Sequence, residues 1–116
     1  MIYIIDDDEI MAECIEKACK KPAKSFSNAI EAMLDIAGGE IPELIFLDIL
    51  LDGPDGFTFL DELMSYPDTK KIPIVIVSSL DFKDKNLTEY GVVGVLDKDK
   101  MTPEEISSYV DKYASQ

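Results

Sequence analysis

Residues 44–48 read Leu-Ile-Phe-Leu-Asp, four apolar side chains followed by a carboxylate. A near-continuous run of large apolar residues is typical of a central strand in a parallel sheet, because helices cover both faces of such a strand. An aspartate at the end of a buried strand is unfavourable unless a partner compensates for the lost water. The stretch therefore predicts a buried strand over Leu44–Leu47 that brings a functional carboxylate, Asp48, to the edge of a sheet.

Four further apolar runs flank this strand and alternate with segments of helical spacing. The predicted strands are Ile2–Ile5, Ala23–Phe26, Leu44–Leu47, Ile74–Val77 and Val92–Leu96. Alternating strands and amphipathic helices are typical of an α/β protein with a parallel sheet. The second run is the weakest and is therefore expected at an edge of the sheet.

Apolar residues recur at helical spacing in three segments between the strands. The predicted buried stripes are Met11, Cys14, Ile15 and Ala18; Ile30, Met33, Leu34 and Ala37; and Leu60, Leu63 and Met64. A further helix is expected within Asp81–Tyr90, where the apolar pattern is poorest. No linker or repeat interrupts the pattern, so the expectation is one domain over residues 1–116 with no attached output domain.

The last predicted helix begins after Thr102, with Pro103 at its first position and Glu105 able to complete a capping box. Its predicted buried stripe consists of Ile106, Tyr109, Val110 and Tyr113.

The composition fits one globular domain and narrows its partners. The chain has 116 residues, 47% hydrophobic and 30% charged, and 24 acidic against 11 basic residues give a net charge of −13. This charge opposes binding to nucleic acids and anionic membranes, so protein or cation partners are expected. The chain has no membrane-length apolar run and no recognisable signal peptide, which predicts a cytoplasmic location. Cys14 and Cys19 match no metal or redox motif and are expected to be small core residues.

Polar side chains follow four of the five predicted strands. They are Asp6-Asp7-Asp8 after the first, Asp48 after the third, Ser78-Ser79 after the fourth and Asp97-Lys98 after the fifth. In an open parallel sheet the functional crevice lies beyond the carboxyl ends of the strands. These side chains are therefore expected to converge at one edge.

Their chemistry suits the transfer of a phosphoryl group to a carboxylate. Clustered carboxylates repel one another, and Mg²⁺ prefers oxygen ligands and binds phosphate oxygens, so Asp6 and Asp7 are interpreted as a metal seat. Asp48 is the candidate nucleophile, because a carboxylate can form a covalent acyl phosphate. Lys98 and the Ser78 hydroxyl would stabilise the other phosphoryl oxygens.

Each of these residues also has a purely structural interpretation. Asp6–Asp8 could form a solvated turn whose last member caps the first helix, and Asp48 could bond to loop amides. Ser78 could satisfy backbone groups at a strand end, and Lys98 lies in a charged loop that water would solvate in any case. The complete set, distributed over several strands, favours function.

The ordered set resembles the receiver domain of two-component response regulators over essentially the whole chain. The matching motifs are Ile4-Ile5-Asp6-Asp7-Asp8, Leu44–Ile49, Asp55-Gly56, Pro73–Ser79 and Lys98. The resemblance implies a flavodoxin-like, doubly wound α/β/α fold in three layers, with a five-stranded parallel sheet of order 2-1-3-4-5 and five helices. It also implies a single-domain receiver of the chemotaxis type.

By the same resemblance, Asp48 would accept a phosphoryl group from a sensor histidine kinase or a histidine phosphotransfer protein. Asp7 and Asp48 would ligate Mg²⁺ directly together with the Leu50 backbone carbonyl, while Asp6 would act partly through water. Histidine is absent from the chain, so the phospho-donor must belong to a partner. A downstream protein target would bind the face formed by the fourth helix, the fifth strand and the fifth helix.

Three positions depart from the family's pattern. Asp52 and Asp99 stand where prolines are common, and a trans Lys98–Asp99 bond is therefore expected. Val95 stands where the family has an aromatic switch residue. These departures keep open the alternative of a degenerate receiver that acts as a phosphorylation-independent scaffold for protein interactions.

Leu50 bears on the reaction class. A phosphatase or phosphotransferase acting on small molecules would ordinarily have a second aspartate at this position as acid and base, so that class is disfavoured. By the resemblance, Leu50 and Leu80 flank the phosphoryl group, and neither side chain can orient an attacking water. The chain is therefore expected to be a signalling switch with slow autodephosphorylation, and not an enzyme.

Overall fold

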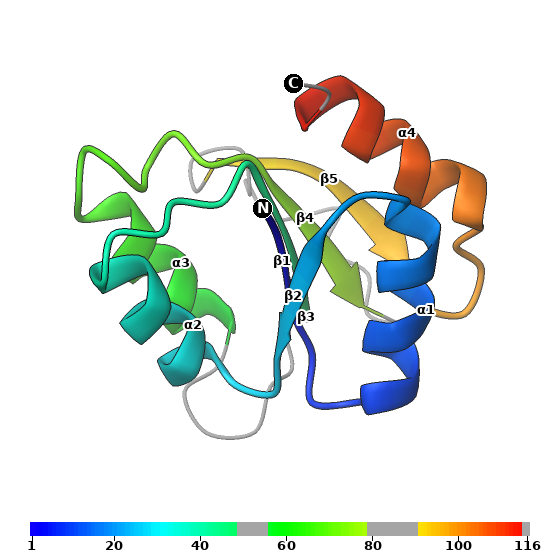
Figure 1. Ribbon diagram of the computed structural model, residues 1–116, viewed down its shortest axis with the longest axis horizontal. Helices are drawn as coiled ribbons and strands as arrows, with labels where there is room; N and C mark the ends of the chain where they lie inside the picture. Colours follow the sequence, from blue (N-terminus) through cyan, green and yellow to red (C-terminus); the bar gives the residue numbers. More distant parts are fainter. Residues whose placement is uncertain (49–55, 79–90, 115–116) are drawn as a thin grey trace.

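The computed structural model describes residues 1–48, 56–78 and 91–114 of the chain. These residues form three layers, with a sheet between two pairs of helices (Figure 1). The elements are β1 (Ile2–Ile5), α1 (Glu9–Cys19), β2 (Ala23–Phe26), α2 (Ala29–Ala37), β3 (Leu44–Asp48), α3 (Gly56–Met64), β4 (Ile74–Ser78), β5 (Val92–Asp97) and α4 (Pro103–Tyr113). None of these described helices is long and apolar enough to cross a membrane.

The five strands are parallel and lie in the order β2-β1-β3-β4-β5. This confirms the predicted doubly wound fold and places β2 at an edge, as expected. All five strands begin at the predicted residue, and β3, β4 and β5 each extend one residue further than predicted. The helix expected within Asp81–Tyr90 lies outside the described residues.

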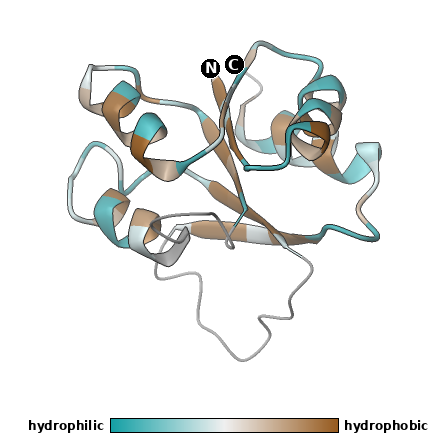
Figure 2. Ribbon diagram, turned by 90° about the horizontal axis from the view of Figure 1, so that it is seen from below, coloured by the Kyte–Doolittle hydropathy of each residue, from teal (hydrophilic) through white to brown (hydrophobic). Residues whose placement is uncertain are grey.

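Alternate residues of the central strands face opposite pairs of helices. Six nearly inaccessible side chains face α2 and α3: Tyr3, Ile5, Ile45, Leu47, Ile74 and Ile76. Six more face α1 and α4: Ile2, Ile4, Leu44, Phe46, Val75 and Val77. Because both of their faces are covered, the central strands are apolar along most of their length, whereas the helices carry both apolar and polar bands (Figure 2).

Side chains cap the first and last helices: the cap of the last helix was predicted, and the cap by Asp8 belonged to the structural alternative for Asp6–Asp8. The Asp8 carboxylate accepts hydrogen bonds from the backbone N–H groups of Ile10 and Met11 at 3.0 and 3.2 Å. Thr102 and Glu105 form a reciprocal capping box at the start of α4. In the predicted stripe of α4, Ile106 and Val110 are buried, while Tyr109 and Tyr113 are partly buried against the same cluster. Both helices therefore start at fixed points relative to the strands before them.

The predicted apolar stripe of α2 is wrong except for Met33, which is partly buried against the core. This helix buries Ala29, Ala32 and Ile36, whereas Ile30 and Leu34 are 54% and 69% exposed. Apolar residues occur around most of the circumference of this helix. Helical spacing alone therefore does not determine which face packs against the sheet. The observed face carries two alanines, whose small side chains let the helix approach the sheet closely.

Smaller errors affect the stripes predicted for α1 and α3. Cys14 is exposed and not a core residue, while Cys19 is buried. Both thiols are free, and Ala12 is buried on α1 in addition to the predicted Ile15 and Ala18. On α3, Met64 is 36% exposed, whereas the other two members of its predicted stripe are buried.

Candidate functional site

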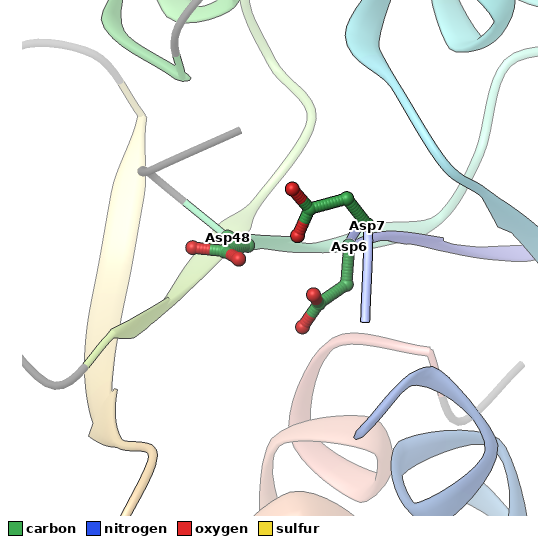
Figure 3. Close-up of side chains that lie close together, drawn as sticks. All are labelled: Asp6, Asp7 and Asp48. Atoms are coloured by element: carbon green, nitrogen blue, oxygen red, sulfur yellow. The ribbon is translucent and has the colours of Figure 1, made fainter. Parts of the chain in front are cut away.

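The carboxylates of Asp6, Asp7 and Asp48 meet at the carboxyl edge of the sheet (Figure 3). Asp6 and Asp7 directly follow β1, and Asp48 is the last residue of β3. The parallel register pairs Ile5 with Leu47, so the residues that follow them, Asp6 and Asp48, lie side by side. Each of the three carboxylates offers one oxygen within 4.8 Å of the others. The structure thus brings together the three acidic side chains that the sequence selected.

Lys98 adds a positive charge to this cluster. Its Nζ donates a hydrogen bond to Asp48 Oδ2 at 3.0 Å and lies 3.4 Å from Asp6 Oδ2. The backbone N–H of Lys98 donates to the Ser78 carbonyl at 3.1 Å, which ties the residue after β5 to the end of β4. The Lys98–Asp99 peptide bond is trans, as expected. With this trans bond, the Lys98 side chain still contacts Asp48.

Burial and charge act together on Asp6. Asp6 and Asp48 are each 4% exposed, whereas Asp7 is exposed. Burial raises the pKa of Asp6 to about 6, and the negative charge of Asp48 adds to this effect. The Asp8 backbone N–H, 2.9 Å from Asp6 Oδ1, and the nearby Lys98 ammonium both oppose the increase in pKa. The site therefore holds more negative charge than its protein donors compensate.

The two buried carboxylates also shift the pKa of Lys98. Burial by itself would lower the pKa of the ammonium, because it disfavours the charged form. The hydrogen bond to Asp48 and the attraction of Asp6 and Asp48 outweigh that effect, and the pKa of Lys98 is raised. Lys98 is therefore a fixed cation at this site in neutral solution.

The donor set fits a hard divalent cation. Three carboxylates and one ammonium leave two negative charges uncompensated. Asp6 Oδ2 is buried and has no hydrogen-bond partner among the described residues. Carboxylate oxygens at a partly exposed edge suit Mg²⁺, which retains several waters when it binds. Asp6, Asp7 and Asp48 could hold such an ion, while Leu50, the other predicted ligand, lies outside the described residues.

Ser78 is the last residue of β4 and is 2% exposed. Asp48 pairs with Val77 across β3 and β4, so Ser78 lies one residue further toward the edge that carries the carboxylates. This places Ser78 on the strand next to Asp48, at the edge of the sheet that carries the carboxylates. The adjacent loop residues that the sequence singled out lie outside the described residues: Asp52, Asp55, Ser79 and Leu80.

A polar network between β1, β2 and α2 was not predicted. The Tyr3 hydroxyl donates to Asp35 Oδ2 at 2.7 Å, and Lys24 Nζ lies 2.9 Å from the same oxygen. The hydrogen bonds from Lys24 and Tyr3 lower the pKa of Asp35, while burial and the Asp35 carboxylate raise the pKa of Tyr3. The sequence did contain a signal for this network, namely Tyr3 in an otherwise aliphatic strand. A buried tyrosine hydroxyl requires a hydrogen-bond partner.

Asp6→Asn should stabilise the metal-free protein more at pH 7 than at pH 4. The pKa of Asp6 is raised from 3.8 to about 6 in the folded protein, so between these values the unfolded state loses its proton first. The stability of the wild type should therefore fall as pH rises through this window, by on the order of 2 kcal/mol from this group alone. Urea unfolding of both proteins in chelator across this range measures the difference. A wild-type deficit that does not change with pH would contradict the prediction.

Comparisons with known proteins agree with this geometry. The family model for the response regulator receiver domain matches residues 2–111. Response regulator PleD from Caulobacter vibrioides is 32% identical over 82 residues, which cover 69% of this chain and 18% of PleD. Sensor histidine kinase CheAY from Helicobacter pylori is 29% identical over 101 residues, which cover 77% of this chain and 13% of CheAY. The chain thus spans less than a fifth of either relative.

The fold is shared with a solved structure over nearly its full length. A putative response regulator from Chloroflexus aurantiacus superposes with a TM-score of 0.85 at 27% identity, covering 99% of this chain and 97% of that protein. The family match, the strand order and the acidic cluster at the end of β1 and β3 agree with one another. The chain therefore belongs to the family of response regulator receiver domains, which act in two-component signalling.

Proposed function

We propose that this receiver domain is a phosphorylation switch that accepts a phosphoryl group on Asp48 with the help of bound Mg²⁺. The main support is the single cluster formed by Asp6, Asp7, Asp48 and Lys98, in which one divalent cation would balance the remaining charge. Receiver domains of this family act with histidine kinases or phosphotransfer proteins. The donor would be such a protein, or a small phosphodonor, since these 116 residues contain no histidine.

In the proposed reaction, an Asp48 carboxylate oxygen attacks the phosphorus of a partner's phosphohistidine. The new P–O bond forms as the P–N bond breaks, and the departing imidazole takes up a proton. Mg²⁺, when bound, would neutralise charge on the phosphoryl oxygens. Asp6, Asp7 and Asp48 would hold that ion.

Lys98 and Ser78 would act on the product. Lys98 Nζ donates to Asp48 Oδ2 at 3.0 Å, so a phosphoryl group formed on Asp48 would lie within reach of the ammonium. The Ser78 hydroxyl, at the end of the neighbouring strand, would donate to another phosphoryl oxygen. Phosphorylation would place negative charge further out than the Asp48 carboxylate. The Lys98 and Ser78 side chains would then move to contact the phosphoryl oxygens, and a downstream protein target could recognise that change.

The direct test is to incubate the purified protein with acetyl phosphate and Mg²⁺ and to measure its intact mass. We expect the mass of one added phosphoryl group, its removal by neutral hydroxylamine, and no addition in chelator. Absence of the adduct in the wild type would contradict the proposal. It would favour the phosphorylation-independent scaffold, in line with Val95, which is 42% exposed at the position of the family's aromatic switch residue.

We further expect the phosphorylated protein to lose its phosphoryl group slowly. Leu50 and Leu80 cannot orient a water for attack on phosphorus, and this expectation rests on their apolar chemistry alone. The measurement is the decay of the adduct in Mg²⁺ after the donor has been removed. Leu50→Asn should shorten the half-life, because an amide can hydrogen-bond a water. A half-life of seconds in the wild type would rule the expectation out.

A further inference from the structure

An apolar groove runs between α2 and α3 on the outside of the molecule. These two helices lie side by side on the same face of the sheet (Figure 1). Two hollows of about 360 and 470 Å³ follow this boundary, and Met33, Ala37 and Tyr66 line both of them. The hollows are therefore adjacent parts of one groove. It lies over a helical face of the molecule, whereas the carboxylates lie at the end of the strands.

Large apolar side chains are exposed along this groove. Ile30, Leu34, Ile41 and Tyr66 line it and are 54%, 69%, 44% and 53% exposed. They are four of the nine large hydrophobic side chains that are exposed in the described part of the chain. α2 uses its other face to cover the sheet, so the fold itself does not require this second apolar face. Clustered apolar exposure of this kind marks interaction surfaces.

The charged side chains among the described residues that line the groove are both acidic. They are Glu62 on α3 and Asp68 in the segment after it, and they form the acidic rim of the groove. Lys70 and Lys71 follow soon after Asp68 in the sequence but line neither hollow. Within the described part of the chain, neither Glu62 nor Asp68 forms an ion pair. Like charges facing each other are unfavourable, so this rim disfavours an anionic membrane and a second copy that presents the same groove.

We propose that the α2–α3 groove binds a basic amphipathic helix of a partner protein, with its apolar side in the groove and its lysines or arginines against the acidic rim. The helices α2 and α3 cover the sheet here, so no strand edge is offered to an extended peptide. A helix satisfies its own backbone hydrogen bonds and can lay apolar side chains into such a groove. The inference does not depend on phosphorylation of Asp48.

The test uses the full chain, labelled with ¹⁵N, and a synthetic helical peptide built from leucine and lysine with one apolar face. A matched peptide with glutamate in place of lysine is the charge control. We expect amide shifts concentrated in α2 and α3 with the lysine peptide and none with the glutamate peptide. Leu34→Gln should weaken binding roughly ten-fold or more, since it removes a large apolar contact. Ile30→Gln should act in the same direction.

Ile10→Gln is the matched control, because Ile10 is 75% exposed on α1, on the opposite face of the sheet. It should leave the affinity within a factor of about two, as expected for a surface change away from the groove. Asp48→Ala should also bind normally, which separates this proposal from the phosphorylation switch. Shifts spread over all acidic surfaces, or equal losses in Ile10→Gln and Leu34→Gln, would refute the groove. A dimer in sedimentation that Leu34→Gln dissociates would assign the groove to a second copy and overturn the proposal.

Discussion

Asp48→Ala should show no phosphoryl adduct under conditions in which the wild type is fully labelled by acetyl phosphate and Mg²⁺. Asp48 is the carboxylate that lies beside Asp6 and accepts a hydrogen bond from Lys98, so its removal takes away the proposed nucleophile and one proposed metal ligand. Asp6 is equally buried and lies 3.4 Å from Lys98 Nζ, but it is Asp48 that accepts the 3.0 Å hydrogen bond from this ammonium. We therefore expect complete loss, measured by intact mass with and without hydroxylamine.

Asp97→Asn provides the matched control. Asp97 also ends a parallel strand at the same edge, but it is exposed and lies outside the acidic cluster. This variant should be labelled like the wild type. The Asp48→Ala protein should remain folded, since it removes one of three mutually repelling carboxylates. An adduct that persists in folded Asp48→Ala would show that another residue accepts the phosphoryl group.

Phe46→Ala should destabilise the fold by about 3–5 kcal/mol, the range for truncation of a fully buried aromatic side chain. Phe46 is 1% exposed at the centre of β3 and belongs to the core between the sheet and the pair α1 and α4. It pairs with Ile4 on β1 and with Val75 on β4. Its loss leaves a cavity beneath the strand that positions Asp48. The change in the free energy of unfolding can be measured by urea titration.

Tyr66→Ala is the comparison for this prediction. Tyr66 is also aromatic but is 53% exposed, so its truncation should change the free energy of unfolding by less than about 1 kcal/mol. If Phe46→Ala were equally mild, the core on this side of the sheet would be less closely packed than the structure indicates. Labelling of the Phe46→Ala protein by acetyl phosphate and Mg²⁺ would show whether β3 still holds Asp48 in place.

Much of the candidate site could be predicted because it depends on strand ends. The apolar runs locate the strands, and in a parallel sheet all carboxyl ends lie at one edge. Asp6, Asp7, Asp48, Ser78 and Lys98 could therefore be selected together. The distance between them could not be obtained this way, because it depends on register and on side-chain direction. The contact of Lys98 with Asp48 spans strands β3 to β5 and follows only from the assembled sheet.

The errors fall where a helix offers more than one apolar face. Periodicity identified α2 but selected Ile30 and Leu34 as core residues, although the sheet side is formed by Ala29, Ala32 and Ile36. The rotation of a helix about its own axis is set by the surface against which it packs. The same reason explains the exposure of Cys14. Helical spacing from Ile15 and Ala18 is equally compatible with a buried face that contains Ala12 and Cys19, and this is the face that packs against the sheet.

By itself, the sequence determined the positions of the strands, the parallel α/β class and the acidic residues at the strand ends, since each is encoded by neighbours along the chain. Only the tertiary structure decided that Asp6, Asp7 and Asp48 are close enough to share one cation, that Lys98 contacts two of them, and that α2 turns an apolar face outward. These features join segments that are far apart in sequence, and packing fixes their geometry.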